Sequence, residues 1–273
     1  MSMHTEWISF EQNGTKHRLY AARPERAKAP LPVVLVIQEL WGTDDHILDL
    51  TERFARAGYL AVAPDLYAVG GQRPESLTEE RIEQIKRFLD TLAPPAWHDP
   101  VAREAALEKQ PEELREILRV TFTDLFAYLG KLPELLERIQ AATAFLADYE
   151  WSRGQKIASI GFCMGGALSI MLAASEPKLA GAVNFYGRMP VSKEQVAAIQ
   201  CPIRGFFGEL DPKITSLVPE FEQAMSEANK SFTYNVYEGA HHGFLNDTRG
   251  GYHVEISRDA WKETIYFFHK VLS

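Results

Sequence analysis

The segment 157–166 reads I-A-S-I-G-F-C-M-G-G, in which a short apolar run meets a cysteine flanked by glycines. From Ala167 onward the residues take up a helical pattern. An apolar run that leads directly into a helix is typical of one strand-to-helix unit of a parallel sheet. Gly161 and Gly165 leave room for a sharp turn between the two elements. Such a turn would project the side chain of Cys163 from the end of the strand.

The same alternation of strand and helix continues on both sides of this turn. The run V-V-L-V-I within 32–38 is continuous and apolar, and a helical pattern over 49–57 follows it. Continuous apolar runs suit strands that are covered on both faces, so the alternation predicts a doubly wound, mostly parallel α/β sheet. The remaining expected elements are a hairpin over 6–20 turning at Asn13-Gly14, strands over 59–65, 156–160, 181–186, 203–207 and 232–237, and helices over 167–174 and 261–271.

The alternation stops between residues 71 and 132, where we expect a helical insertion in a single domain of 273 residues. Ser76-x-x-Glu79 has the spacing of a capping box and would begin one helix, and Pro111 would begin a second. A third helix, over 133–149, is expected to cross over and pack on the sheet. The insertion could cap an active site, or it could be a surface excursion that never contacts substrate.

The composition narrows the possible partners. The net charge of −8 argues against a nucleic acid or an anionic membrane as partner. No apolar run approaches the ~20 residues that a membrane-spanning helix needs. Two cysteines do not make a disulfide framework, which predicts a reduced, cytoplasmic setting. The sequence has no Cys/His pair at metal spacing and no phosphate-binding glycine loop, so we expect no metal and no cofactor. Nothing in the sequence indicates the oligomeric state.

The position of Cys163 suits a nucleophile. The helix that follows directs its N-terminal amides and the positive end of its dipole at the sulfur, which favours a thiolate over a thiol. The backbone N–H of Met164 could donate to an oxyanion formed beside it. A lone cysteine is more often a small, inert side chain, so the hypothesis needs partners elsewhere in the chain. Cys201, just before Pro202, has no such surroundings, and we interpret it as structural.

Two polar side chains with the required chemistry follow later strands. Asp211 and His242 each come just after the carboxyl end of a predicted strand, where open α/β sheets place their ligands. Nucleophile, then acid, then histidine is the chain order of the α/β-hydrolases. We therefore predict an α/β-hydrolase fold with the triad Cys163, Asp211 and His242. His241 could replace His242, and Glu209 could replace Asp211.

These segments resemble the dienelactone hydrolases, which are also called carboxymethylenebutenolidases. The resemblance covers most of the chain outside the insertion, and a cysteine in the turn together with Gln-Glu after the first long strand makes it specific. It rests on five stretches, which are Q-E-L-W-G at 38–42, A-P-D-L-Y at 63–67, G-F-C-M-G-G at 161–166, G-E-L-D at 208–211 and G-A-H-H-G-F at 239–244.

The resemblance implies hydrolysis of a small-molecule ester or lactone through a thioester acyl-enzyme. It implies the same triad, and it adds a role for Glu39, which would take the thiol proton when substrate arrives. A free cysteine thiol is mostly protonated at neutral pH, so such an acceptor makes physical sense. The resemblance also implies an oxyanion hole made by the backbone amides of Leu40 and Met164. Because thiolate leaves a tetrahedral intermediate easily, we expect aryl or enol esters and lactones to react better than amides.

One departure from the family concerns the substrate carboxylate. The family holds it with arginines, one of them four residues after the catalytic histidine, and this chain has Asn246 at that position. Arg81 in the insertion could supply another arginine, or it could simply be solvated beside its acidic neighbours. Trp41 and Tyr186 complete the candidate substrate-binding residues. The departure puts the dienelactone itself in doubt as substrate, but not ester or lactone hydrolysis.

Two other classes of protein remain possible on sequence alone. A non-catalytic module that binds ligands could use the same scaffold, because a fold does not guarantee chemistry. A redox-sensing thiol at Cys163 is the other, although no resolving cysteine lies nearby in the sequence.

Overall fold

An eight-stranded sheet forms the centre of the molecule in a computed structural model that describes every residue except Met1 and His98. The strand order is β1-β2-β4-β3-β5-β6-β7-β8. β1 pairs antiparallel with β2, β2 pairs antiparallel with β4, and all the other neighbours are parallel. The predicted mostly parallel sheet is therefore confirmed. The strands are β1 (Met3–Gln12), β2 (Thr15–Pro24), β3 (Val33–Ile37), β4 (Leu60–Pro64), β5 (Ile157–Phe162), β6 (Gly181–Phe185), β7 (Ile203–Gly208) and β8 (Phe232–Tyr237).

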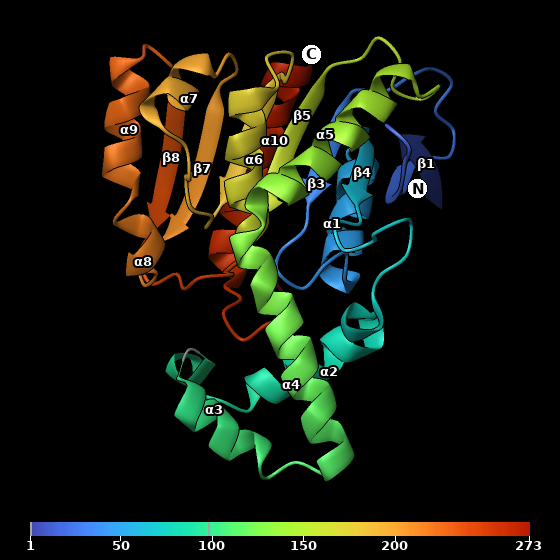
Figure 1. The fold of residues 1–273 in the computed structure, drawn as a ribbon. Coiled ribbons are helices and arrows are strands. Elements are labelled where there is room, and N and C mark those ends of the chain that lie inside the picture. Colours follow the sequence, from blue (N-terminus) through green and yellow to red (C-terminus); the bar gives the residue numbers. More distant parts are fainter. Residues whose placement is uncertain (1, 98) are drawn as a thin grey trace.

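Helices cover both faces of this sheet (Figure 1). The continuous apolar run of β3 shows why, since Val34 and Val36 join the core on one face while Val33, Leu35 and Ile37 join the core on the other. All five side chains are fully buried, as expected for a strand between two layers. The first face carries α1 (Asp45–Arg56) and α10 (Val254–Leu272), and the second carries α5 (Leu132–Asp148), α6 (Met164–Ser175), α7 (Lys193–Ala198) and α9 (Val218–Glu227).

The helical insertion lies beyond the carboxyl ends of the parallel strands (Figure 1). Its buried leucines and isoleucines, among them Ile82, Leu89, Leu118 and Leu125, belong to the same core cluster as the α5–α9 face of the sheet. The core of the insertion is therefore continuous with the core on the α5–α9 face and is not a separate one. Its elements are η1 (Glu75–Leu77), α2 (Glu79–Asp90), η2 (Pro94–Trp97), α3 (Pro100–Leu107), α4 (Glu112–Ala127) and η3 (Tyr128–Gly130).

The capping box predicted at Ser76 is wrong. Ser76 lies inside the short turn η1, and α2 begins only at Glu79, after Thr78, whose side chain makes no capping hydrogen bond. Leu77, the last residue of the turn, is fully buried. The turn that carries Leu77 into the core delays the start of the helix.

One helix of the insertion, α3, was not predicted from the sequence. α3 begins after Asp99, whose side chain accepts hydrogen bonds from the backbone N–H groups of Val101 and Ala102. An acid followed by Pro100 is a recognisable helix start, because proline fits the first helical position. Only eight residues follow before the helix ends, which is too short for a clear apolar periodicity.

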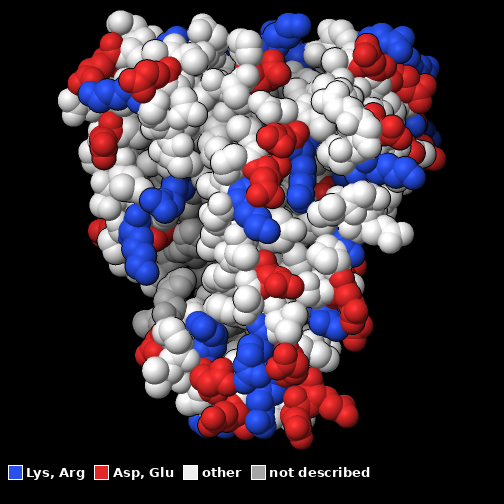
Figure 2. Space-filling view, viewed as in Figure 1, with Lys and Arg blue, Asp and Glu red and all other residues white. Residues whose placement is uncertain are grey.

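The surface of the insertion carries charges of both signs. On the face drawn in Figure 2, acidic and basic side chains are interspersed over the insertion. Within α4, Arg119 forms an ion pair with Glu116. Across the described part of the chain, none of the helices combines the length and the apolar character needed to cross a membrane.

Candidate active site

The turn that carries Cys163 is strained and firmly held. Cys163 has backbone angles of φ 53° and ψ −114°, a conformation that side-chain-bearing residues rarely adopt and that tends to occur at functional sites. Its N–H donates to the carbonyl of Phe185 at 3.0 Å, and its own carbonyl accepts from the N–H of Gly166 at 3.0 Å. The end of β5 and the start of α6 thus fix the cysteine at the carboxyl edge of the sheet.

The glycines of this turn leave no room for a side chain. A Cβ at Gly161 would lie 1.8 Å from the carbonyl oxygen of Gly165, and a Cβ at Gly165 would lie 2.3 Å from that of Ile37. At Gly166 it would lie 2.2 Å from the side-chain oxygen of Asn184. Backbone atoms cannot yield to the contacts at Gly161 and Gly165, so the close approach of β3, β5 and α6 requires glycine at these two positions.

Asp211 and His242 meet beside this turn. His242 Nδ1 lies 2.6 Å from Asp211 Oδ2, and Asp211 is 9% exposed. The loops that carry them are locked together, because the N–H of Leu210 donates to the carbonyl of Ala240 at 2.9 Å. A Cβ at Gly208 would lie 2.4 Å from the same carbonyl oxygen, so the approach again depends on glycine.

His241 and Glu209, the alternatives to His242 and Asp211, do not form an equivalent pair. Glu209 is exposed and accepts a hydrogen bond from the backbone N–H of Gly239 at 3.0 Å, which stiffens the loop before the histidines. His241 is exposed at the edge of the cavity, whereas the carboxylate of Asp211 bonds His242. The geometry favours Asp211 and His242 as the working pair.

The environment of His242 stabilises its protonated form. Burial on its own would lower the pKa of His242, but the charge of Cys163 and the hydrogen bond with Asp211 raise the pKa well above its usual 6.5. The side chain nevertheless remains 42% exposed, so a substrate can reach it.

Glu39 is held by two neutral hydrogen-bond donors. The hydroxyl of Tyr186 donates to Glu39 Oε1 at 3.1 Å, and the side-chain amide of Asn246 donates to Oε2 at 2.7 Å. All three residues are buried. Burial and the nearby charges of Glu39 and Cys163 raise the pKa of Tyr186 well above its usual 10, so the phenol keeps its proton and stays a donor. Tyr186, like Cys163, adopts a positive φ, here 41°.

A cavity of about 590 Å³ joins these side chains to the insertion. Cys163, His242 and Glu39 open into it from the sheet edge, and Leu40 and Trp41 line it beside them. Across the cavity, the insertion supplies Asp90, Leu92 and Trp97.

The four residues expected to bind substrate take different places. Trp41 lines the cavity. Asn246 also lines it, but its amide is engaged with Glu39. Tyr186 is fully buried behind the cavity and acts on Glu39 rather than forming part of the wall. Arg81 pairs with Glu75 at 2.6 Å and does not line the cavity.

Arg249 is a cavity residue that sequence reasoning missed. Its guanidinium lies 4.8 Å from the ring centroid of Trp41 and 5.5 Å from that of Trp97. Two of its nitrogens pair with the two carboxylate oxygens of Asp90, at 2.9 and 3.1 Å. These contacts come from two distant parts of the chain, the loop at Trp41 and the segment 90–97, so no local sequence pattern indicates them.

A second link ties the insertion to the sheet close to the cavity. Lys86 of α2 pairs with Asp44 at 3.0 Å, and both side chains are buried. Burial acts to lower the pKa of Lys86, but the carboxylates of Asp44 and Glu83 raise it above its usual value, so the ammonium stays charged. Asp44 also caps α1 by accepting from the N–H of Ile47.

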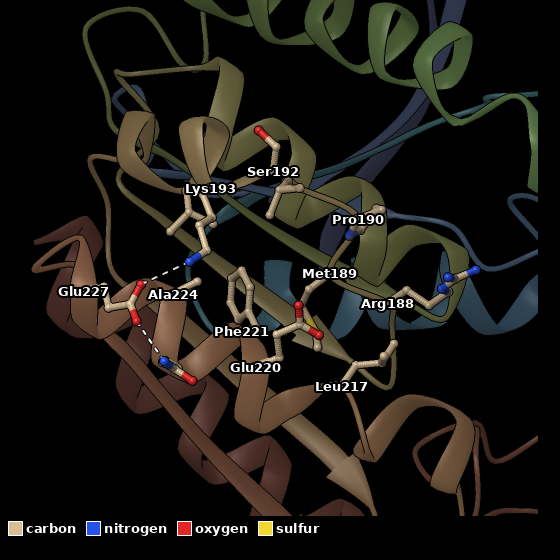
Figure 3. A pocket seen from close by; sticks show the side chains of 13 residues that line it. Arg188, Met189, Pro190, Ser192, Lys193, Leu217, Glu220, Phe221, Ala224 and Glu227 are labelled. Carbon is tan, nitrogen blue, oxygen red and sulfur yellow. Dashed lines mark hydrogen bonds and ion pairs between the residues drawn. The ribbon is translucent and has the colours of Figure 1, made fainter.

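A separate hollow of about 480 Å³ lies between α7 and α9 (Figure 3). Met189, Val196 and Phe221 form part of its lining, and Lys193 pairs with Glu227 at its rim. No candidate catalytic residue lines it. Within the residues that the structure describes, no group of three or more His, Cys, Asp or Glu side chains is placed to hold a metal ion.

The strand order, the strained turn and the acid–histidine pair beside it define an α/β-hydrolase fold. The model of the dienelactone hydrolase family matches residues 18–272, so the chain belongs to that family and its class is hydrolase. Membership of a hydrolase family implies a small-molecule substrate.

Relatives along the full length support this assignment. A candidate carboxymethylenebutenolidase of Saccharolobus solfataricus is 32% identical, over 97% of this chain and 98% of its own. One from Escherichia coli K12 is 28% identical, over 96% of this chain and 85% of its own. Among solved structures, a candidate dienelactone hydrolase from Klebsiella pneumoniae shares a TM-score of 0.71 at 26% identity, covering 98% of this chain and 99% of the other.

Proposed function

We propose that the protein hydrolyses carboxylic esters or lactones with Cys163 as nucleophile, through a thioester acyl-enzyme. The observation that carries the proposal is the placement of Cys163 at a strained turn beside His242, which itself pairs with Asp211 at 2.6 Å. A nucleophile, a base and a group that orients the base are the parts that covalent acyl transfer needs.

The first step is removal of the thiol proton. His242 can accept it, because its raised pKa makes the neutral imidazole a strong proton acceptor. Glu39 is the second acceptor, suggested by the family resemblance. It opens into the same cavity, and its two neutral donors orient the carboxylate without cancelling its charge.

The thiolate then attacks the carbonyl carbon, and the carbonyl oxygen becomes an oxyanion. The backbone N–H of Met164 is the first of α6, so it has no partner inside the helix and is available to the oxyanion. Leu40 supplies the second N–H, and the hydroxyl of Tyr67 helps to fix its backbone by donating to the Leu40 carbonyl at 2.7 Å. Two such donors stabilise charge that develops only during reaction.

The intermediate collapses when the C–O bond to the leaving group breaks. The departing oxygen takes a proton from the His242 imidazolium, and the acyl group stays on the sulfur as a thioester. His242, oriented by Asp211, then removes a proton from water, and the resulting attack releases the carboxylic acid and restores the thiolate. Because thiolate also leaves easily, substrates with good leaving groups, such as aryl or enol esters and lactones, should react best.

Residues 71–132 act as a cap in this proposal. They supply Asp90, Leu92 and Trp97 to the cavity that contains Cys163, which supports contact with substrate over a purely surface role. The cytoplasmic location expected from the two cysteines stays a prediction.

The experiment that tests the proposal compares Cys163→Ala with Cys201→Ala on an aryl ester. Loss of a triad member costs at least about a thousandfold in turnover. We expect that loss in Cys163→Ala and near-normal turnover in Cys201→Ala. Normal turnover in Cys163→Ala would refute the proposal. Stoichiometric acylation of wild-type Cys163, without turnover of any ester or lactone, would favour a non-catalytic ligand-binding module instead.

A further inference from the structure

The charges around the cavity are unevenly balanced. Apart from His242, whose positive charge is balanced by its partner Asp211, Glu39 and Asp90 place two carboxylates in the wall of the cavity, and Arg249 places one guanidinium there. Among the described residues that line it, no other Lys or Arg is present. The partners of Glu39 are a phenol and an amide, which bring no positive charge.

The one guanidinium is already engaged. Arg249 and Asp90 form a bidentate ion pair, in which both carboxylate oxygens accept hydrogen bonds from guanidinium nitrogens. This geometry is the strongest that an arginine and a carboxylate can adopt. The arginine side chain is only 10% exposed, so its charge is largely withdrawn from solvent.

The indole rings hold the arginine in place independently of Asp90. Trp41 comes from the loop after β3 and Trp97 from the insertion, and both rings lie within cation–π distance of the guanidinium. Around this pair the cavity presents the remaining indole surface together with Leu92 and Leu210. Such walls suit an aromatic or other apolar group.

We infer that Asp90 sets the charge selectivity of the site by masking Arg249, so that the cavity accepts uncharged aromatic or apolar esters and disfavours esters that carry a carboxylate. The inference rests on the proposed hydrolase function and names its substrate class. A substrate carboxylate would have to displace Asp90 from Arg249 and would then lie close to an unpaired acid. An uncharged aromatic group can bind without displacing Asp90 and is not repelled by its carboxylate.

The inference predicts that removing the mask reverses the selectivity. In Asp90→Asn the indoles still hold the arginine, but its charge becomes available to an incoming carboxylate. A charge-assisted hydrogen bond is worth enough to change a rate by about tenfold or more, and we take the lower figure because Asp90 is half exposed. Arg249→Gln should change selectivity in the opposite direction, since it leaves the Asp90 carboxylate alone in the wall.

The test uses 4-acetoxybenzoate and its methyl ester, two aryl acetates that differ in one carboxylate charge. Release of the phenol is followed by absorbance, and each kcat/KM is divided by the rate of base-catalysed hydrolysis of the same ester. We expect the wild type to favour the methyl ester, and the ratio of anionic to neutral kcat/KM to rise about tenfold in Asp90→Asn. The rise should vanish in the double variant Asp90→Asn/Arg249→Gln.

Glu80→Gln is the matched control, because Glu80 is an exposed acid on the same helix that does not line the cavity. It removes one negative charge from α2 and should leave the ratio unchanged. A rise in Glu80→Gln as large as in Asp90→Asn would mean that the general field, and not the pair, is responsible, which overturns the inference. A wild type that prefers the anion, an unchanged ratio in Asp90→Asn, or a rise that survives in the double variant would also overturn it. If the wild type hydrolyses neither ester nor any other, the proposed function has failed instead.

Discussion

Replacing Asp211 by Asn should lower the pKa of His242 and slow the reaction strongly. The carboxylate lies 2.6 Å from Nδ1, and its charge stabilises the imidazolium. An amide of the same shape keeps a hydrogen-bonding group there but removes the charge, so the pKa falls and does not rise.

The magnitude follows from the geometry. Hydrogen bonds to charged groups contribute about 1.5–3 kcal/mol, and we take the lower end because 42% of the His242 side chain is exposed. Since one pKa unit corresponds to about 1.4 kcal/mol, the pKa of His242 should fall by roughly one unit. Loss of the orienting carboxylate also frees the imidazole to take the wrong tautomer, and comparable changes cost about 10⁴-fold in kcat.

Two assays measure these effects. NMR titration of the histidine ring protons gives the pKa directly, with His242→Gln identifying the resonance, and steady-state hydrolysis of an aryl ester gives kcat. The raised pKa adds stability that is fully present below pH 6.5 and is lost as pH rises through the folded-state value, so in Asp211→Asn this loss should be smaller and should be complete at a lower pH. An unchanged His242 pKa together with unchanged kcat would refute the role given to Asp211.

Two further predictions concern other parts of the site. Asn246→Leu removes the donor to Glu39 Oε2 inside a buried site, which should lower the free energy of unfolding by about 1.5–3 kcal/mol in urea titrations. A variant as stable as the wild type would show that the hydrogen bond to Glu39 contributes little. Burial raises the pKa of Cys201 to about 11, so iodoacetamide at pH 8 should label Cys163 and spare Cys201 in the folded protein, as peptide mass mapping would show. Equal labelling of the two thiols would contradict the interpretation of Cys163 as the reactive thiol and of Cys201 as structural.

The parallel sheet and the position of the turn could be predicted because both have local signatures. A strand buried on both faces needs a continuous apolar run, and a sharp turn beside a packed helix needs glycine, so β3, β5 and the segment around Cys163 are visible in the sequence. The placement of Asp211 and His242 followed from chain order, since parallel strands bring their carboxyl ends to one edge.

Contacts between distant segments could not be predicted in the same way. Glu39 lies 147 residues from Tyr186 and 207 from Asn246, and nothing near any of them in sequence indicates the two hydrogen bonds. The Arg249–Asp90 pair spans 159 residues for the same reason. Arg81 was considered from the sequence and Arg249 was missed, because only the packing of the insertion against the loop after β8 brings Arg249, and not Arg81, to the cavity.

The most direct test follows the sulfur itself during turnover. An aryl ester is mixed with the enzyme, and the reaction is quenched at times from milliseconds to seconds. The mass of the peptide that contains Cys163 is then measured by mass spectrometry. We predict that one acyl group appears on Cys163 and decays at a rate that accounts for kcat. Complete turnover of the ester with Cys163 never acylated would contradict covalent catalysis at this residue.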